Sequence, residues 1–388
     1  MPNIAERCFV KLYLTSQRDD NQVVRPAGLP QRMHRPTDSR PVMPVYEIDP
    51  TTDERWDSFL ESHPQASIFH TGGWLNALRR TYGYTPVVFT TSPPAVPISN
   101  GIPFCHVSSW ISGCRLVSLP FSDHCTPLVE NSAQLTYLLT YLQNKVAVDG
   151  WRYIEIRPTT SVASCCPAFE TSKIFCFHRL DLHPSLDEIS RRFHKDCVKR
   201  KIQRAARERL VCEKGTSDSL LDKFYSLLLM TRRRHRLLAQ PTNWFRNLIA
   251  CLGEQVNIRV ASTNGQPVAS ILTLRYKKAL VYKYGCSDQK FNMLGGMQML
   301  LWNAIQEAKE SNLSEFDLGR TDCDAPGLLA FKERWGATRT ESTYLRYPLE
   351  HSRGILHTGQ EFLGKHLWSH APGEVLAAAG RVLYKHMG

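Results

Sequence analysis

The chain has 388 residues, enough for two domains with a core each, and its 42% hydrophobic and 22% charged residues are typical of globular proteins. Lys and Arg number 48 against 36 Asp and Glu, a formal net charge of +12. Such an excess suits a polyanionic partner, such as nucleic acid, a nucleotide-linked sugar or an anionic membrane face, or is background without function. The 12 cysteines include no CxxC pair, which argues against a disulfide framework or a zinc site and for a reducing cytoplasm.

Neither a signal peptide nor a membrane span is predicted. Residues 1–20 are polar and contain Arg, Lys and Asp, unlike a secretory leader. Residues 81–114 contain no Asp, Glu, Lys or Arg, but prolines interrupt them too often for a spanning helix. We therefore expect a soluble protein.

The first half of the chain begins with a polar stretch at residues 1–42, which we interpret as a disordered leader. Globular patterning starts at Val45, with helices expected at 53–63, 73–82 (capped by Thr71) and 134–147, and a strand at 153–156. Asp123 and His124 lie in a loop after a strand, where polar side chains often face a binding site. A role in the turn itself is equally compatible with the pattern.

Residues 187–210 predict an amphipathic helix with a basic face. Nine Lys or Arg stand against four Asp or Glu, a local net charge of 9 − 4 = +5. Such a face can bind phosphates, as RNA engagement requires, or it can simply be solvated.

The next predicted helix, 218–238, ends in the basic segment TRRRH at residues 231–235. Three arginines and a histidine stabilise a helix C-terminus, and arginine forks also suit pyrophosphate oxygens. Strands are expected at 256–261, 267–275 and 280–284, with an Asn264-Gly265 turn between the first two.

The segment 279–337 predicts strand, glycine turn, helix, short strand and helix. The glycine pair Gly295-Gly296 precedes the first of these helices, and Gly319 is expected to end the second strand. A glycine turn that feeds a helix N-terminus presents unpaired N–H groups, which suits a phosphate or a developing oxyanion. An ordinary helix start reads the same way.

Four motifs in this half, YKYGCSD, LGGMQMLLWNAIQEA, FDLGR and GLLAFKERWGA, resemble the second acyltransferase domain of the FemAB family. Members of this family have GNAT-like folds and make peptidoglycan cross-bridges, and relatives are encoded near polysaccharide-export genes. The resemblance runs from about residue 43 to 348. It implies an α/β protein with two tandem GNAT-like domains, 43–178 and 179–348. For residues 349–388, which lie beyond the resemblance, composition and the amphipathic last segment predict a basic helical tail.

The resemblance also implies roles for particular residues. Lys332 matches a lysine that offsets charge near the acyl donor, Tyr284 a tyrosine near the acceptor, and Arg233 or Arg232 an arginine that holds a nucleotide-sugar acceptor. Alternatively, Lys332 is a surface lysine and Tyr284 a core tyrosine, each without a catalytic role. From position alone, Asp317 is a candidate to orient or deprotonate the amine, unless it only pairs with Arg320. The remaining candidates for substrate binding are His235, Gly295, Gly296, Arg320, Asp123 and Arg79.

We therefore expect an N-acyltransferase that transfers an acyl or aminoacyl group to an amine of a cell-envelope precursor of peptidoglycan or exopolysaccharide. No nucleophile-base pair has recognisable spacing, so direct attack by the amine is favoured over an acyl-enzyme. The co-substrate is acyl-CoA or aminoacyl-tRNA, with no tightly bound cofactor and no metal. The expected partners are a nucleotide- or lipid-linked precursor, with tRNA and the inner membrane face as further candidates for a cytoplasmic protein. The alternative is a non-catalytic nucleotide-sugar- or RNA-binding protein that retains the fold.

Overall fold

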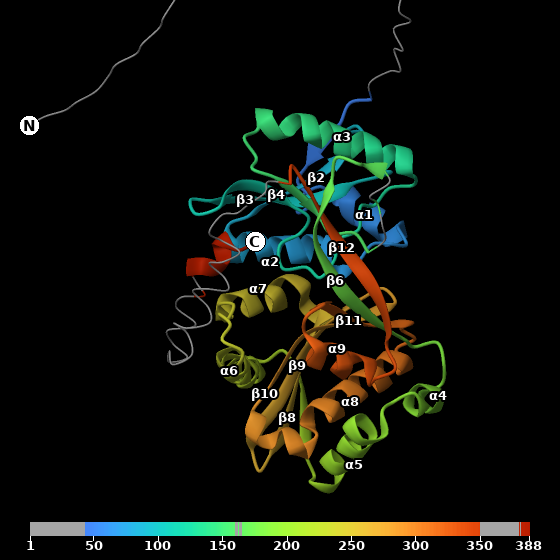
Figure 1. The fold of residues 1–388 in the computed structure, drawn as a ribbon, viewed down its shortest axis with the longest axis vertical. Coiled ribbons are helices and arrows are strands. Elements are labelled where there is room, and N and C mark those ends of the chain that lie inside the picture. Colours follow the sequence, from blue (N-terminus) through green and yellow to red (C-terminus); the bar gives the residue numbers. More distant parts are fainter. Residues whose placement is uncertain (1–42, 160–161, 163–164, 350–379, 381) are drawn as a thin grey trace, which may run out of the picture. The chain divides into compact units, whose positions relative to one another are not determined.

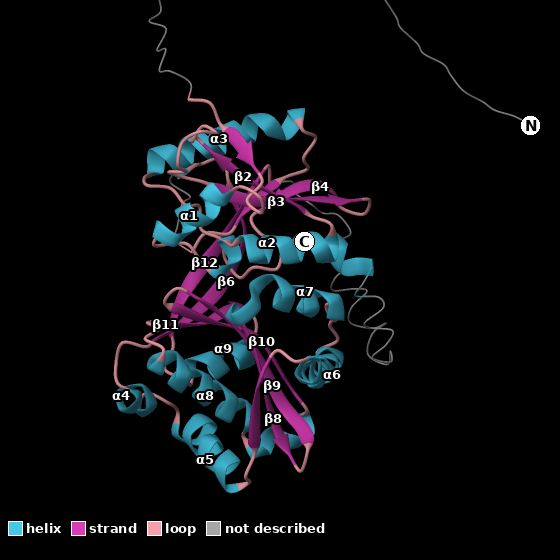
Figure 2. Ribbon diagram, turned by 180° about the vertical axis from the view of Figure 1, so that it is seen from behind, coloured by secondary structure: helices cyan, strands magenta, loops and turns pink. Residues whose placement is uncertain are grey.

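One mixed sheet of twelve strands runs through the computed structural model, with helices packed against it (Figures 1 and 2). The structure describes residues 43–159, 162, 165–349, 380 and 382–388. The predicted leader at 1–42 and most of the predicted tail at 349–388 lie outside these residues.

The first half of the described chain contains β1 (Tyr46–Ile48), α1 (Glu54–Ser62), α2 (Gly72–Tyr82), β2 (Thr85–Thr90), β3 (Ile102–Ser109), β4 (Gly113–Val117), α3 (Ser132–Val148) and β5 (Ile154–Ile156). Thr71 caps α2 as predicted, because its side chain accepts a hydrogen bond from the Trp74 amide.

The second half contains β6 (Glu170–Asp181), α4 (Leu186–Arg191), α5 (Arg200–Arg207), β7 (Val211–Gly215), α6 (Asp218–Arg234), α7 (Thr242–Leu252), β8 (Val256–Thr263), β9 (Gln266–Tyr276), β10 (Ala279–Ser287), α8 (Gly296–Glu310), β11 (Glu315–Asp322), α9 (Pro326–Glu333) and β12 (Thr338–Tyr347). The three expected strands at 256–284 are β8, β9 and β10.

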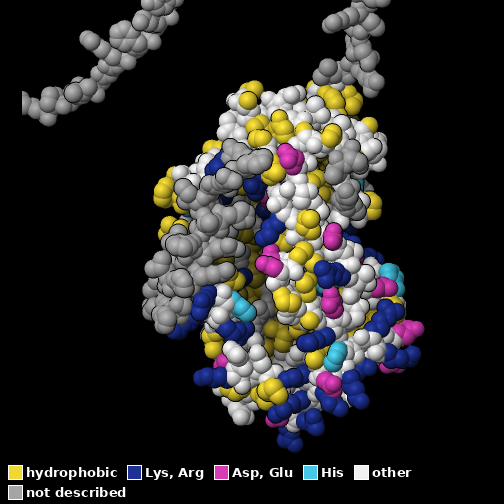
Figure 3. All heavy atoms as spheres, viewed as in Figure 1, with side chains coloured by type: hydrophobic (Ala, Val, Ile, Leu, Met, Phe, Trp, Pro, Cys, Tyr) yellow, Lys and Arg dark blue, Asp and Glu magenta, His cyan; other side chains and the backbone are white. Residues whose placement is uncertain are grey.

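The helix expected at 187–210 is interrupted. It forms α4, then a π-helical turn at Lys195–Lys199, then α5. His194 causes the break, because its ring accepts hydrogen bonds from the amides of Asp196 and Cys197 while its own amide donates to the Arg334 carbonyl. Figure 3 shows Lys and Arg side chains gathered on the part of the molecule that contains α4 and α5.

The two halves share the long antiparallel pair β6–β12 (Figure 1). The sheet order is β1-β2-β3-β4-β5-β12-β6-β11-β10-β9-β8-β7, so β12 joins the first-half strand β5, and β6 joins β11. The proposed boundary at 178/179 falls within β6. Most neighbouring strands are antiparallel, whereas β4–β5 and β10–β11 are parallel.

Large apolar clusters cover both sides of the second-half strands. Trp74 of α2 packs edge-on against Trp244 of α7 with ring centroids 5.2 Å apart, which joins helices of both halves. A second cluster lies under α8 and includes Trp335, with Phe193 edge-on at 5.0 Å. These layers fix β10 and β11 in position between them.

Candidate active site

The parallel strands β10 and β11 pair at only three positions, of which the last is Val281–Asp317. Both strands continue beyond this point, but each is irregular: β10 has a bulge between Tyr282 and Tyr284, and β11 changes register between Asp317 and Arg320. We call the space where they part the β10/β11 fork. A bulge redirects side chains that a regular strand would alternate.

Gly319 allows β11 to make this turn. Its φ is +71°, a conformation that strongly favours glycine, and an added Cβ would lie 3.2 Å from Oδ2 of Asp123. The strand therefore does not end at Gly319, as expected from the sequence, but bends there and continues to Asp322.

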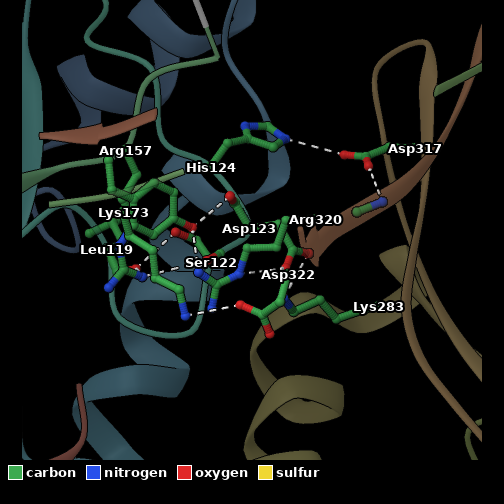
Figure 4. A network of polar contacts seen from close by, with 12 residues as sticks. Leu119, Ser122, Asp123, His124, Arg157, Lys173, Lys283, Asp317, Arg320 and Asp322 are labelled. Atoms are coloured by element: carbon green, nitrogen blue, oxygen red, sulfur yellow. Dashed lines mark hydrogen bonds and ion pairs between the residues drawn. The ribbon is translucent and has the colours of Figure 1, made fainter. Parts of the chain in front are cut away.

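Asp123 enters the β10/β11 fork from the loop that follows β4 (Figure 4). Its Oδ2 accepts a hydrogen bond from Nζ of Lys283 at 2.9 Å, and its Oδ1 lies 3.8 Å from Nε of Arg320. Burial alone would raise the pKa of Asp123, but Lys283 and Arg320 outweigh it and lower this pKa. The first half thus supplies a carboxylate to a site built by second-half strands.

The neighbouring residue His124 contacts Asp317. Its Nε2 lies 3.2 Å from Oδ2 of Asp317, whose Oδ1 accepts the Gly319 amide at 2.6 Å. The imidazole packs edge-on to Phe69 and Phe177, with centroids 5.1 and 5.3 Å away. Aromatic walls and one carboxylate therefore hold the ring in a single orientation.

Lys332 reaches the same fork from α9. Its Nζ donates to the carbonyl oxygens of Gly319 at 2.8 Å and Arg320 at 3.0 Å. The residue is only 2% exposed, and this burial lowers its pKa to about 8, although Asp123 and Asp317 act in the opposite direction. An ammonium group with a pKa near neutrality can give up a proton during a reaction.

The described network carries an excess of positive charge. Three cationic side chains, Lys283, Arg320 and Lys332, face the two carboxylates Asp123 and Asp317, a formal difference of 3 − 2 = +1. Buried charges are costly unless they are balanced. This imbalance is complementary to a group that carries, or develops, negative charge.

A cavity of about 370 Å³ lies at the start of α8. Its wall is mostly apolar, with two cations, and consists of Cys197, Val198, Lys201, Val268, Ala269, Ser287, Phe291, Asn292, Gly296, Met297, Gln298, Phe331 and Arg334. Helix α9 links cavity and fork, because Phe331 lines the cavity and the next residue, Lys332, reaches the fork. The cavity matches an elongated ligand with an apolar arm and an anionic end.

The glycine pair shapes this cavity. Gly295 has φ +82°, and a Cβ there would lie 2.2 Å from the Lys201 carbonyl oxygen. Gly296 begins α8, and a Cβ added there would lie 3.2–3.3 Å from side chains of β8 and β9. The free N–H groups of the first turn of α8 are thus available at the cavity wall, as an anion requires.

The basic segment at the end of α6 lies beside a second hollow of about 480 Å³, which shares Ser287 with the first. Arg234 lines it and donates to the Ser287 carbonyl at 3.1 Å. Of the predicted clamp residues, Arg233 and His235 are exposed and Arg232 is half-buried, and none is among the lining residues of the two hollows.

Two further candidates lie away from the fork network. Tyr284 is buried in an apolar cluster, where its hydroxyl accepts a hydrogen bond from Nε1 of Trp244 at 2.9 Å. Arg79 pairs with Asp49 at 2.6 Å and donates to Thr51. Both have structural contacts that account for their positions.

The structure thus brings together Asp123, Asp317, Arg320 and Lys332 from the predicted set and adds Lys283 and His124. Lys283 lies within YKYG, where the two tyrosines dominate the strand pattern. His124 stands next to Asp123 in the loop already noted, but nothing in the sequence says that its ring meets Asp317.

Among the described residues, no group of three or more His, Cys, Asp or Glu side chains is arranged to hold a metal ion. None of the described helices has the length and apolar composition needed to cross a bilayer.

Residues 192–333 match the family model described as "Acetyltransferase (GNAT) domain". This range contains α5 to α9, all the cavity-lining residues except Arg334, and most of the fork network. The prediction of a GNAT-type acyltransferase is confirmed at this level, and the match specifies neither donor nor acceptor. No curated protein sequence matches the chain significantly.

Solved structures share the fold. FemX aligns with a TM-score of 0.63 at 15% identity, covering 83% of this chain and 99% of FemX. L-PGS from Bacillus licheniformis aligns at 0.52 and 14% identity, covering 81% and 97%. The C-terminal domain of a putative lysylphosphatidylglycerol synthetase from Agrobacterium fabrum aligns at 0.50 and 14%, covering 76% and 90%. The expected FemAB-like α/β fold is therefore confirmed.

Proposed function

We propose that this chain, an acyltransferase with a GNAT domain inside a FemX-type fold, transfers an acyl group from acyl-CoA to an amine at the β10/β11 fork. The observation that carries the proposal is the fork itself: two parallel strands part around a buried charged network, which α9 links to a cavity at a helix N-terminus.

The cavity suits the donor. The first-turn N–H groups of α8, with Lys201 and Arg334, would bind the phosphates, and the apolar wall near Phe331 would hold the pantetheine arm. The thioester would then enter the fork beside Lys332. We favour acyl-CoA over aminoacyl-tRNA because residues 192–333 match an acetyltransferase (GNAT) domain model.

The fork network suits the chemistry of amine acylation. His124, oriented by Asp317, is placed to accept the proton of the attacking amine. As the carbonyl carbon is attacked and the thiol leaves, negative charge develops on oxygen and then on sulfur. Lys332, with its lowered pKa, is placed to stabilise that charge and to protonate the leaving sulfur. Asp123 and Lys283 join the first-half loop to the fork.

For the acceptor, we propose an amine of a nucleotide- or lipid-linked cell-envelope precursor. The supporting argument is the fold shared with FemX and with a putative lysylphosphatidylglycerol synthetase. A lipid-linked acceptor would bring the protein to the inner face of the membrane, and we propose that the acceptor binds at the fork, where the first-half loop with Asp123 meets the second-half strands.

Donor binding can be tested with acetyl-CoA, CoA and charged tRNA by calorimetry on the wild type and two variants. Arg334→Gln removes a cavity cation, and we expect about tenfold weaker CoA binding. Lys309→Gln is the matched control, because Lys309 lies in the last turn of the same helix α8 and contacts only the His183 carbonyl among its described partners. Binding of charged tRNA alone, or equal CoA affinities for both variants, would contradict the proposal.

A further inference from the structure

Cys176 and Cys323 form a close thiol pair outside the fork network. Their sulfur atoms are 3.3 Å apart, although 147 positions separate the residues in sequence. Cys176 lies in β6, opposite Thr321 of β11, and Cys323 begins the connection from β11 to α9. The pairing of β6 with β11 therefore keeps the two cysteines next to each other.

The two thiols differ in access. Cys323 is exposed, whereas Cys176 is fully buried at 0%. Cys323 also contacts the Ile174 carbonyl at 3.6 Å, which directs its sulfur toward β6. A small oxidant can thus reach one sulfur, with the second sulfur directly behind it.

A guanidinium lies close to the thiol pair. Proximity to Cys176 and a hydrogen bond with it raise the pKa of Arg339, and the hydrogen bond to Cys176 raises the pKa of Cys323.

We propose that Cys176 and Cys323 are a redox-active dithiol site that peroxides convert to an intramolecular disulfide. The Cys323 sulfur attacks the peroxide oxygen, the O–O bond breaks, and hydrogen peroxide yields a sulfenic acid and one water. The Cys176 sulfur then attacks the sulfenic sulfur, and the S–O oxygen leaves as a second water with the proton of the Cys176 thiol. The two thiols lose two electrons, which the peroxide gains. The product ties the β11–α9 connection to β6.

The test treats the folded full-length protein with hydrogen peroxide and measures its intact mass, with non-reducing peptide mapping. We expect a loss of about 2 Da, localised to a Cys176–Cys323 linked peptide and reversed by dithiothreitol. Cys323→Ser should abolish this linked peptide. Cys176→Ser should leave a sulfenic acid at Cys323 that a cyclic 1,3-dione traps.

Cys114→Ser is the matched control, because Cys114 is also exposed and its described contact is Ser108 rather than a second thiol. This variant should form the linked peptide as the wild type does. Two results would overturn the proposal. One is oxidation of Cys323 in the wild-type protein while Cys176 remains a free thiol, and the other is pairing of Cys323 with any other cysteine.

Discussion

The β10/β11 fork has a counterpart in the first half of the chain, where β4 and β5 are also parallel. They pair at Leu116–Ile154 and Val117–Glu155. In each fork the last paired residue of the later strand is acidic: Glu155 in β5 and Asp317 in β11. The segments YIEIR and EFDLG align at these acids. The two forks therefore share a parallel strand pair and an acid at the same position, whereas only β11 bends two residues later, at Gly319.

Their contents differ. Arg157, two residues after Glu155, turns back and donates to it at 2.8 and 2.9 Å, and Arg346 of β12 donates to the other oxygen at 2.8 Å. Arg157 also donates to the Leu119 carbonyl at 2.6 Å. Burial would raise the pKa of Glu155, but the two arginines lower it to about 2. The first fork is thus filled and its carboxylate is locked as an anion.

The corresponding position in the second fork is Gly319, which has no side chain to fill the space. The Gly319 amide donates a hydrogen bond to Oδ1 of Asp317, and Nε2 of His124 contacts Oδ2. The comparison teaches that a parallel strand pair with an acid at this position can serve as a structural joint or as a reaction site. The side chain two residues after the acid decides which.

The largest effect is expected from Lys332→Met, which keeps the buried stem and removes the ammonium. Transfer should fall by about 10³-fold in kcat, because a preorganised charge at the reaction centre is lost. Steady-state kinetics and a CoA binding titration provide the test. Wild-type turnover in a folded variant would show that Lys332 has no role in the mechanism. The β10/β11 fork would then lose this difference from the β4/β5 fork.

Glu155→Gln tests the first fork and should act on stability rather than on donor binding. It leaves Arg157 and Arg346 buried without their anion, which costs about 3 kcal/mol. Urea denaturation measures the loss, and CoA affinity measured on the folded protein is the internal control. A large change in CoA affinity would show that the first fork also binds donor.

His124→Gln should lower kcat by about 10²-fold, because the amide preserves much of the side-chain shape but cannot accept a proton as imidazole does. Steady-state kinetics measure kcat, and a CoA binding titration is the control for folding. A folded variant with wild-type kcat would assign the base role elsewhere.

The smallest effect is a pH-dependent contribution of Lys332 to stability. Its folded pKa of about 8 lies below that of an unfolded lysine, about 10.4. Between these values the unfolded chain binds more protons, so the free energy of unfolding should increase with pH, by about 1 kcal/mol from pH 8 to 9 at most. Denaturation of the wild type and Lys332→Met at both pH values isolates this contribution. An identical pH dependence in the two proteins would contradict the buried, depressed lysine.

Much of the architecture could be predicted from the sequence, because it depends on local signals. Apolar periodicity, the Thr71 cap and the Asn264-Gly265 turn predict the helices and strands, and the four motifs of the second half predict the fold. Lys332 and Asp317 were also named as candidates, from motif resemblance and from position beside a strand end, and both side chains lie at the fork. These signals are contained within a few neighbouring residues.

Only the tertiary structure brought His124 to Asp317 and Asp123 to Lys283, across 193 and 160 positions of sequence. Lys283, rather than the predicted Tyr284, reaches the network. The β10 bulge between Tyr282 and Tyr284 interrupts the regular alternation of side chains between the two faces of the sheet. The alternating sequence pattern of a strand does not reveal such a bulge. The thiol pair likewise exists because β6 lies beside β11. The sequence by itself determined the elements and their chemistry, whereas long-range strand pairing decided which of those groups meet.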